Sequence, residues 1–414
     1  MREQTIKRQL LSLPVNARFT LLLQPLWSIP FFLYNSYSSL YMIKLGITPT
    51  EIGIISSAGF VFRTIVAIFA GSIINRLGRK VSTILFDALS WLLPLLLWAF
   101  AANYWFFLLA GIINSVVVIN GMSAQLYLIE DTNADQRFFC FSIMEVVNVM
   151  SGFLVPLTGF LIGKYTLVPT IRGIYIFAFV CMCIMIVSKI VFLSDTTIGQ
   201  KLKEKKKNNK YIFADLLKDS SYIIGKPQLV VLMSTNILIN FGATISGLYL
   251  FPYLTGHIGF KEAEVSVFPF LSSVVILAVL LLLVPRIKNK KRFMKLGLLM
   301  YVIGAVLLVT SPVIGSVTTV VLAFLILIAN TFCWAFARAF LTPIIQEAIA
   351  DEVDNNVRAN VMGVFSMLST LCIFPAGFIG GMLYQYRPIY PFFFALLIYI
   401  VSLMLFMCKG KAHQ

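Results

Sequence analysis

Charged residues are scarce in this chain of 414 residues, and their scarcity limits the classes of protein to which it can belong. Asp, Glu, Lys and Arg make up 12% of the sequence, about half the share that is usual in soluble domains, while hydrophobic residues make up 59%. Apolar stretches of about 18 residues or more recur along the whole length. Because each is long enough to cross a hydrocarbon core as a helix, the composition excludes a soluble domain and predicts an all-α integral membrane protein.

Residues that usually build catalytic and metal sites are also few. The two histidines, His257 and His413, form no cluster with other metal ligands, and the six cysteines form no C-x-x-C pair. The sequence contains no glycine-rich phosphate loop and no nucleophile elbow. We therefore expect no enzymatic activity, no metal and no cofactor, and we interpret the cysteines as small packing residues.

The apolar stretches divide into twelve predicted spans, whose ends are placed to within roughly 2–4 residues. The spans are residues 19–42, 52–74, 82–101, 104–128, 138–163, 170–193, 229–254, 263–284, 294–312, 315–345, 359–384 and 388–408. The first is too long for a cleavable signal peptide and contains two prolines, so we expect it to remain in the protein as a helix.

Basic residues outnumber acidic ones by 33 to 17, and they are distributed unevenly over the predicted loops. With the N-terminus in the cytoplasm, 25 of the 33 Lys and Arg lie in cytoplasmic segments and five lie on the opposite side. The positive-inside rule therefore predicts a multi-pass protein with both termini cytoplasmic, in a plasma membrane that the lysine-rich loops suggest is bacterial. Because these cations are spread over several short loops, we expect no nucleic-acid partner.

Four pairs of features recur at a nearly constant spacing along the chain. The segment LGITPTEIGI (45–54) enters the second span and IGFKEAEVSV (258–267) enters the eighth, each with Gly and Glu five residues apart. The pairs Gly46/Gly259, Glu130/Glu347, Arg137/Arg358 and Pro156/Pro375 have offsets of 213, 217, 221 and 219 residues. So steady an offset predicts two parallel six-helix repeats.

The longest cytoplasmic connection separates the two predicted repeats. We therefore expect an N-terminal six-helix bundle at residues 1–193, a linker at 194–228 and a C-terminal six-helix bundle at 229–414. The linker includes the basic run KLKEKKKNNK (201–210). The stretch after it, YIFADLLKDSSYII (211–224), has the pattern of an amphipathic helix that lies on the membrane surface.

The stretch GSIINRLGRKVS (71–82) places three cations between the second and third spans. It resembles the loop motif of the major facilitator superfamily, roughly G-x-x-x-D-R-x-G-R-R/K, which implies a twelve-helix secondary transporter that works by alternating access. The matching residues are Gly71, Asn75, Arg76, Gly78, Arg79 and Lys80. The chain departs from the pattern at Asn75, where the family usually has Asp, and so lacks a charge that could face a helix N-terminus.

The cations of this loop have two expected roles. They hold the loop at the anionic cytoplasmic face, beside a tight turn that Gly78 allows. The resemblance also implies a latch, in which they pair with acids at the inner ends of neighbouring helices and separate when the cytoplasmic side opens. The candidate cytoplasmic charge partners are Glu130, Asp131, Arg137, Glu347 and Arg358. The alternative is that the cations only enforce topology.

Ionisable residues within the spans are functional candidates, because a charge there costs roughly 2.5–3.5 kcal/mol on insertion scales. Asp87, Glu145 and Arg338 each lie about two turns from the cytoplasmic end, and we interpret them as gating or proton-coupling residues. A Glu145–Arg338 pair would be either an inner gate or a static contact between helices. Arg63, near the middle of its span, suggests an anionic or hydroxyl-rich ligand, or an acid on another helix.

The resemblance implies that the first, fourth, seventh and tenth spans line a central cavity. The candidate cavity residues, with Arg63 of the second span added, are Gln24, Trp27, Tyr34, Asn35, Arg63, Asn114, Asn120, Asn236, Asn240, Asn330, Trp334 and Arg338. Asn330, Trp334 and Arg338 recur every four residues on one helix face, an arrangement that would suit a sugar ring or an aromatic anion. Each asparagine could instead join neighbouring helices by a hydrogen bond, and Trp334 could simply pack.

Together these patterns favour uptake of a small polar solute, a saccharide or an organic anion, with a proton as the candidate coupling ion. Export of amphipathic compounds is the alternative, although the fourth span lacks the Arg and the fifth lacks the full G-P-x-x-G-G run typical of drug/proton antiporters. A third hypothesis is a sensor or scaffold that transports little, which the long linker favours. We expect a monomer in the lipid bilayer.

Overall fold

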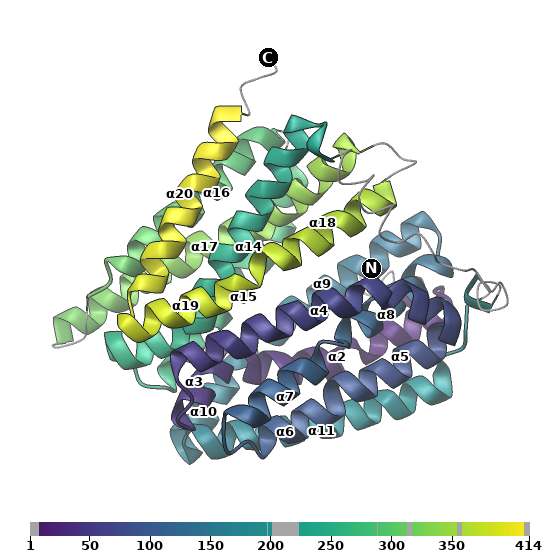
Figure 1. Ribbon diagram of the computed structural model, residues 1–414, viewed down its shortest axis with the longest axis horizontal. Helices are drawn as coiled ribbons and strands as arrows, with labels where there is room; N and C mark the ends of the chain where they lie inside the picture. The colour runs from purple at the N-terminus through teal and green to yellow at the C-terminus, as the bar shows by residue number, and fades with distance from the viewer. Residues whose placement is uncertain are drawn as a thin grey trace. The chain divides into compact units, whose positions relative to one another are not determined.

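The computed structural model describes residues 8–196, 198–200, 223–287, 289–312, 317–353 and 358–409, and the regular structure in those ranges is entirely helical (Figure 1). This confirms the all-α class that the composition predicts. The basic run 201–210 and most of the predicted surface helix at 211–224 lie outside the described residues.

The helices of the first half are α2 (Val15–Asn35), α3 (Ser38–Lys44), α4 (Pro49–Leu77), α5 (Arg79–Asp87), the π-helix η1 (Ala88–Leu92), α6 (Leu93–Ala99), α7 (Tyr104–Asn114), α8 (Val117–Glu130), α9 (Ala134–Gly152), α10 (Val155–Tyr165) and α11 (Leu167–Phe192). Those of the second half are α14 (Pro227–Tyr253), η2 (Leu254–Ile258), η3 (Glu264–Ser266), α15 (Val267–Leu282), η4 (Val284–Arg286), α16 (Lys290–Val309), α17 (Val317–Glu352), α18 (Arg358–Ile373), α19 (Pro375–Tyr386) and α20 (Tyr390–Lys409).

Among the described residues, eleven helical segments are long and apolar enough to cross a membrane, and they correspond to the second to twelfth predicted spans. The predicted first span, 19–42, is divided between α2 and α3. Helix α2 has 21 residues, enough for roughly 30 Å. It is less apolar than the other spans because Arg18, Gln24 and two prolines lie within it.

Prolines interrupt the fifth and eleventh spans at matching places. Pro156 lies at the second position of α10, just after the break from α9, and Pro375 begins α19 after the break from α18. Proline has no N–H and restricts the residue before it, so a helix usually ends or bends there. Because these prolines form one of the four sequence pairs, the matching breaks support the predicted repeat.

The helices also pack in the same order in both halves. In the first half α2 packs against α11, and α5 packs against α8. In the second half α14 packs against α20, and α16 packs against α17. In each half, therefore, the first span contacts the sixth and the third contacts the fourth. This shared pattern confirms two parallel six-helix repeats.

By their contacts, the described residues group into two compact units. The first unit takes those within 1–35, 58–154 and 165–209, and the second takes those within 36–57, 155–164 and 210–414. Two segments of the first repeat thus belong with the second unit. The sequence repeat predicts different bounds: bundles at 1–193 and 229–414 and a linker at 194–228. The contact-based units do not test those bounds, which stay a prediction.

Within the second unit, the first residues of α4 (49–57) approach α19 so closely that glycine is required. A Cβ on Gly53 of α4 would overlap the carbonyl oxygen of Gly377 in α19, and a Cβ on Gly377 would lie 2.8 Å from the oxygen of Gly53. The Ser57 hydroxyl donates to the carbonyl of Phe374 at 2.6 Å and accepts from the N–H of Phe378 at 3.0 Å. We call Gly53, Ser57 and Gly377 the glycine seam; small residues of this kind let membrane helices pack backbone to backbone.

Further contacts hold the segment 36–57 within the second unit. The Tyr249 hydroxyl of α14 donates to the carbonyl of Pro49 at 3.1 Å, and Lys44 forms an ion pair with Glu262. These residues lie at the ends of the spans opposite to the basic loops. Together with the glycine seam, these contacts explain why residues 36–57 of the first repeat belong to the second unit.

Replacing Gly53 with Leu is expected to force α4 away from α19, because the new side chain would occupy the position of the Gly377 carbonyl. Overpacking of this kind costs about 1–3 kcal/mol, so the detergent-purified variant should melt several degrees below the parent protein. Gly247→Leu is the matched control, since a Cβ on Gly247 of α14 meets no atom within 4 Å. Equal melting temperatures of the two variants would contradict a tight seam.

Candidate functional site

The loop motif forms a one-residue turn between α4, which ends at Leu77, and α5, which begins at Arg79. Gly78 has a φ of +88°, a conformation that favours glycine because it has no Cβ. A Cβ at this position would also lie 2.9 Å from a carboxylate oxygen of Asp195. Backbone conformation and close packing therefore both require glycine at the tight turn.

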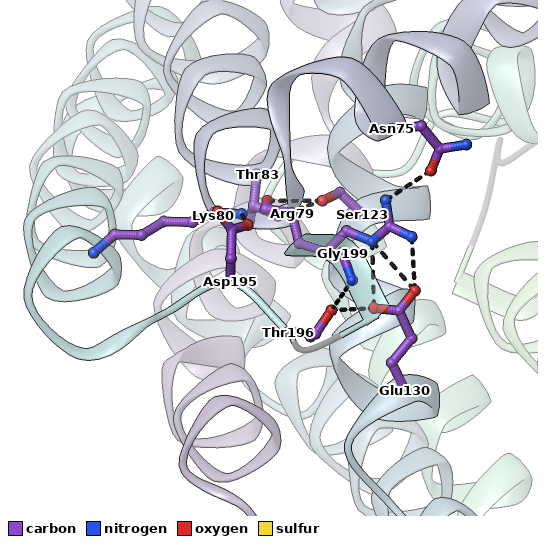
Figure 2. Close-up of polar contacts among 9 residues, drawn as sticks. All are labelled: Asn75, Arg79, Lys80, Thr83, Ser123, Glu130, Asp195, Thr196 and Gly199. Carbon is purple, nitrogen blue, oxygen red and sulfur yellow. Dashed lines mark hydrogen bonds and ion pairs between the residues drawn. The ribbon is translucent and has the colours of Figure 1, made fainter. Parts of the chain in front are cut away.

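The turn directs Arg79 into a buried ion pair with Glu130, the last residue of α8 (Figure 2). The Nη2 atom of Arg79 donates to Oε1 of Glu130 at 2.7 Å, and its Nε donates to the same oxygen at 3.2 Å. The two side chains are 3% and 7% exposed. Nη1 of Arg79 donates to the Oδ1 of Asn75 at 2.8 Å, so the guanidinium has partners on both edges. This is the strong, forked arrangement of a guanidinium and a carboxylate.

Hydroxyl groups attach the same turn to α8. The Ser123 hydroxyl donates to the backbone carbonyl of Arg79 at 3.0 Å, and the Thr83 hydroxyl donates to Ser123 at 2.8 Å. Both hydroxyl residues are fully buried. The first turns of α5 are therefore held on α8 by backbone and side-chain contacts together.

The chain just after α11 reaches this cluster as well. The backbone N–H of Lys80 donates to Oδ1 of Asp195 at 2.8 Å, and the Thr196 hydroxyl donates to Glu130. In Figure 2 the ammonium group of Lys80 points away from the cluster, and Arg76 is not among its nine residues. Sequence reasoning missed Asp195 and Thr196 because neither belongs to a motif; a single acid directly after a span was the one available signal.

The second repeat contains the corresponding ion pair in a weaker form. Glu347, the counterpart of Glu130, pairs with Lys290 at 2.7 Å, and the two side chains are 53% and 46% exposed. Exposed pairs of this kind contribute little to stability. Of the other predicted partners, Asp131 accepts a hydrogen bond from Asn16 at 2.9 Å, and Arg137 of α9 donates to the backbone carbonyl of Thr132, just before that helix. Of the three predicted acids, Glu130 is therefore the one that these contacts pair with a cation of the loop motif, Arg79.

A second buried ion pair in the first unit joins Asp87, about two turns further along α5, to Lys189 of α11. The two side chains are 1% and 8% exposed. The Nδ2 of Asn120 donates to Oδ1 of Asp87, while the Oδ1 of Asn120 is buried without a hydrogen-bond partner among the described residues. Sequence reasoning did not single out Lys189, although a lysine within an apolar span signals a buried partner.

Arg63 of α4 contacts a neutral group in the first unit. Its Nη2 donates to Oδ1 of Asn114 at 3.0 Å, and its guanidinium lies 6.0 Å from the ring centre of Phe60. The Nε atom of Arg63 is buried without a hydrogen-bond partner among the described residues. Asn114 also donates to the carbonyl of Ser90 at 2.8 Å. The arginine therefore retains hydrogen-bonding capacity that these contacts do not use.

The predicted stripe on α17 makes contacts with α16. Asn330 donates to the carbonyl of Gly304 at 2.8 Å, and the indole N–H of Trp334 donates to the carbonyl of Tyr301 at 3.3 Å. The Asn330 contact repeats the Asn114 contact of the first unit at a similar sequence offset. This symmetry favours a role for both asparagines in joining helices, while their role in a cavity stays a prediction.

Side chains on α2 also find partners within the first unit. Gln24 donates to Asn148 of α9 at 3.2 Å, and the Trp27 ring lies 5.8 Å from that of Trp91. The Tyr34 ring lies 4.7 Å from that of Tyr175 in α11. Sequence reasoning missed Asn148, Trp91 and Tyr175 because their spans were not expected to line a cavity.

The remaining predicted residues lie on several helices, and the described contacts do not join them into one site. In α14, Asn240 donates to Asn236 at 2.8 Å, and Asn35 at the end of α2 is exposed. Glu145 lies in α9 of the first unit and Arg338 in α17 of the second, so their pairing stays a prediction.

One predicted cytoplasmic partner is not tested by any contact. The side chain of Arg358, at the start of α18, lies outside the described residues.

The chain is similar to a known family over most of its length. The family model of the Major Facilitator Superfamily matches residues 26–377. No curated protein sequence matches the chain significantly.

Solved transporter structures share the fold. The nucleoside transporter NupG is 16% identical with a TM-score of 0.69, and the alignment covers 95% of this chain and 99% of that one. A D-xylose-proton symporter is 15% identical with a TM-score of 0.71, covering 96% and 98%. The human organic anion transporter MFSD10 (TETRAN) is 15% identical with a TM-score of 0.64, covering 95% and 99%. The family match, the two six-helix repeats and the loop motif show that this chain belongs to the major facilitator superfamily of secondary transporters.

Proposed function

We propose that this chain takes up a small polar solute, a saccharide or an organic anion, by alternating access. The glycine seam is the observation that carries this proposal. It joins residues of the first repeat to the second at the ends of the spans opposite to the basic loops, through close backbone packing and two hydrogen bonds of Ser57. Because packed interfaces have discrete arrangements rather than a continuous range, such a seam can serve as the outer gate.

A polar solute is favoured by the hydrogen-bonding groups inside the spans of the first unit. Arg63 keeps a buried Nε without a partner among the described residues, close to the amide of Asn114. A cation inside a membrane protein is costly unless it faces protein, water or a ligand. The matched structures of a nucleoside transporter, a D-xylose-proton symporter and an organic anion transporter agree with this class of solute.

We assign the Arg79–Glu130 pair to the cytoplasmic end of the first unit. Both partners lie in that unit, so the pair holds the ends of α5 and α8 together rather than joining the two repeats. A buried ion pair gains little net stability over an apolar contact, but leaving one charge without its partner is strongly unfavourable. The pair therefore keeps this end of the unit in one arrangement until both groups can be hydrated together.

Asp87 is our candidate for the group that carries a coupling proton. It is nearly inaccessible and is paired with Lys189, and Asn120 donates to the same carboxylate. Protonation of Asp87 would leave Lys189 as an uncompensated buried charge, so a change of proton occupancy would alter the packing of α5 against α11.

The first experiment is a thermal-stability screen of the purified protein with D-xylose, uridine, citrate and tetraphenylphosphonium. A solute at about 100 times its dissociation constant should stabilise the protein by about 2.7 kcal/mol. We expect stabilisation by one of the polar solutes, and a smaller shift in Arg63→Gln, because the arginine can donate to hydroxyl or anionic groups. Stabilisation by tetraphenylphosphonium alone would favour export of amphipathic compounds instead.

Arg79→Gln and Glu130→Gln should each lower uptake of the stabilising solute into proteoliposomes by about tenfold or more, because each leaves one buried charge without a partner. The double swap Arg79→Glu/Glu130→Arg should recover part of the lost rate. Lys290→Gln is the matched control: it removes the corresponding exposed pair and should change uptake less than about twofold. Normal uptake in both single variants would leave the loop motif with a topological role.

The Asp87–Lys189 pair can be separated into a structural and a proton-coupling role. Asp87→Asn alone should lower stability by about 3–5 kcal/mol, while Asp87→Asn/Lys189→Met should be close to the parent protein because no charge remains unpaired. If Asp87 carries the proton, uptake by the double variant will no longer respond to an imposed pH gradient. A retained response would show that the pair is a static contact.

A further inference from the structure

The N-terminus of α5 lacks a capping side chain of its own. Its N-cap residue is Gly78, which has no side-chain oxygen to accept the free backbone N–H groups of the first turn. A carboxylate from elsewhere in the sequence fills this place: Oδ1 of Asp195 accepts the N–H of Lys80 at 2.8 Å. A Cβ on Gly78 would lie 2.9 and 3.0 Å from the two oxygens of Asp195, so the turn is shaped to admit this carboxylate.

Thr196, which follows Asp195, donates a hydrogen bond to the same Glu130 carboxylate that pairs with Arg79. Nη2 of Arg79 is bonded to Oε1 of Glu130, while the Thr196 hydroxyl is bonded to Oε2. Thr196 is 2% exposed, and its oxygen also accepts the N–H of Gly199 at 2.9 Å. Because the Nε of Arg79 also donates to Oε2 at 3.3 Å, the hydroxyl helps to hold the Glu130 carboxylate in the orientation in which both of its oxygens meet Arg79.

A third contact encloses the arginine itself. A Cβ on Gly199 would lie 3.1 Å from Cγ and 3.3 Å from Cδ of Arg79, so the backbone after α11 lies directly against the arginine side chain. Figure 2 shows Asp195, Thr196 and Gly199 around Arg79 and Glu130. Three residues from one short stretch thus contact the helix N-terminus, the acid and the base of the same cluster.

We infer that Asp195 and Thr196 are positioning residues for the Arg79–Glu130 pair, supplied by the start of the connection between the two repeats. This inference rests on the proposed role of that pair in transport. Asp195 also brings a negative charge to the N-terminus of α5, in a loop whose position 75 is Asn where the resembled motif has Asp. Displacement of Thr196 would remove a hydrogen-bond partner of Glu130, so the described residues just after α11 are coupled to the end of α8 and the start of α5.

Amide hydrogen exchange of the full-length protein in detergent tests the inference without a known substrate. Asp195→Ala should raise exchange in the first turn of α5 by about tenfold, as expected for a lost cap, and Asp195→Asn should raise it less because it keeps the acceptor. Asp135→Asn is the control, since it removes an exposed acid from the start of α9. Exchange in Asp195→Ala equal to that in Asp135→Asn would overturn the role of Asp195.

The role of Thr196 is tested by a conservative pair and a double-mutant cycle. Thr196→Val should raise exchange at the end of α8 and the start of α5 several-fold, and Thr196→Ser, which keeps the hydroxyl, should not. In a Glu130→Gln background the Thr196→Val effect should become much smaller, because the two residues act through the same contact. An equal effect in both backgrounds, or no effect of Thr196→Val, would overturn the inference. Since exchange is measured apart from uptake, these outcomes are distinct from failure of the proposed transport role.

Discussion

The cost of placing a charge away from water governs this structure, because the chain must keep a few ionisable groups inside an otherwise apolar bundle. The buried charges described above each contact a charged or polar group. Arg79 pairs with Glu130, Asp87 pairs with Lys189, and Arg63 donates a hydrogen bond to the amide oxygen of Asn114. The corresponding pair of the second repeat, Lys290 and Glu347, is about half exposed, so either charge can lose its partner at little cost. The two repeats therefore share a helix pattern but differ in how firmly the helix ends at Glu130 and Glu347 are held.

Close approach between backbones is the second constraint, and it acts at the opposite ends of the spans. Glycine at the seam removes side chains where α4 meets α19, and Gly159 of α10 is packed similarly, since a Cβ there would lie 2.5 Å from the carbonyl oxygen of Ala263. Such contacts depend on shape rather than charge, so they can separate without leaving an unpaired ion. The first unit thus keeps a buried ion pair between α5 and α8, while the second unit has close backbone packing between the start of α4 and α19.

The departure at position 75 illustrates how the contacts of a motif can be supplied by different residues. Asn75 still binds Arg79 through its side-chain oxygen, so it continues to orient the guanidinium. The negative charge at the start of α5 comes instead from Asp195, 115 residues beyond its hydrogen-bond partner Lys80. The motif by itself indicates that an acid is missing at position 75, whereas the folded chain has the Asp195 carboxylate beside the start of α5.

The sequence by itself determined the all-α membrane class, the parallel repeats and the turn at Gly78, because hydrophobic length, constant spacing and glycine chemistry are local properties. It also indicated Glu130 as a partner for the loop cations. The tertiary structure decided which pairs form: Lys189 for Asp87, Lys290 for Glu347, and Thr196 for Glu130. These choices depend on which helix faces meet, and a chain in which nearly every span is apolar on all sides carries too weak a periodic signal to predict that.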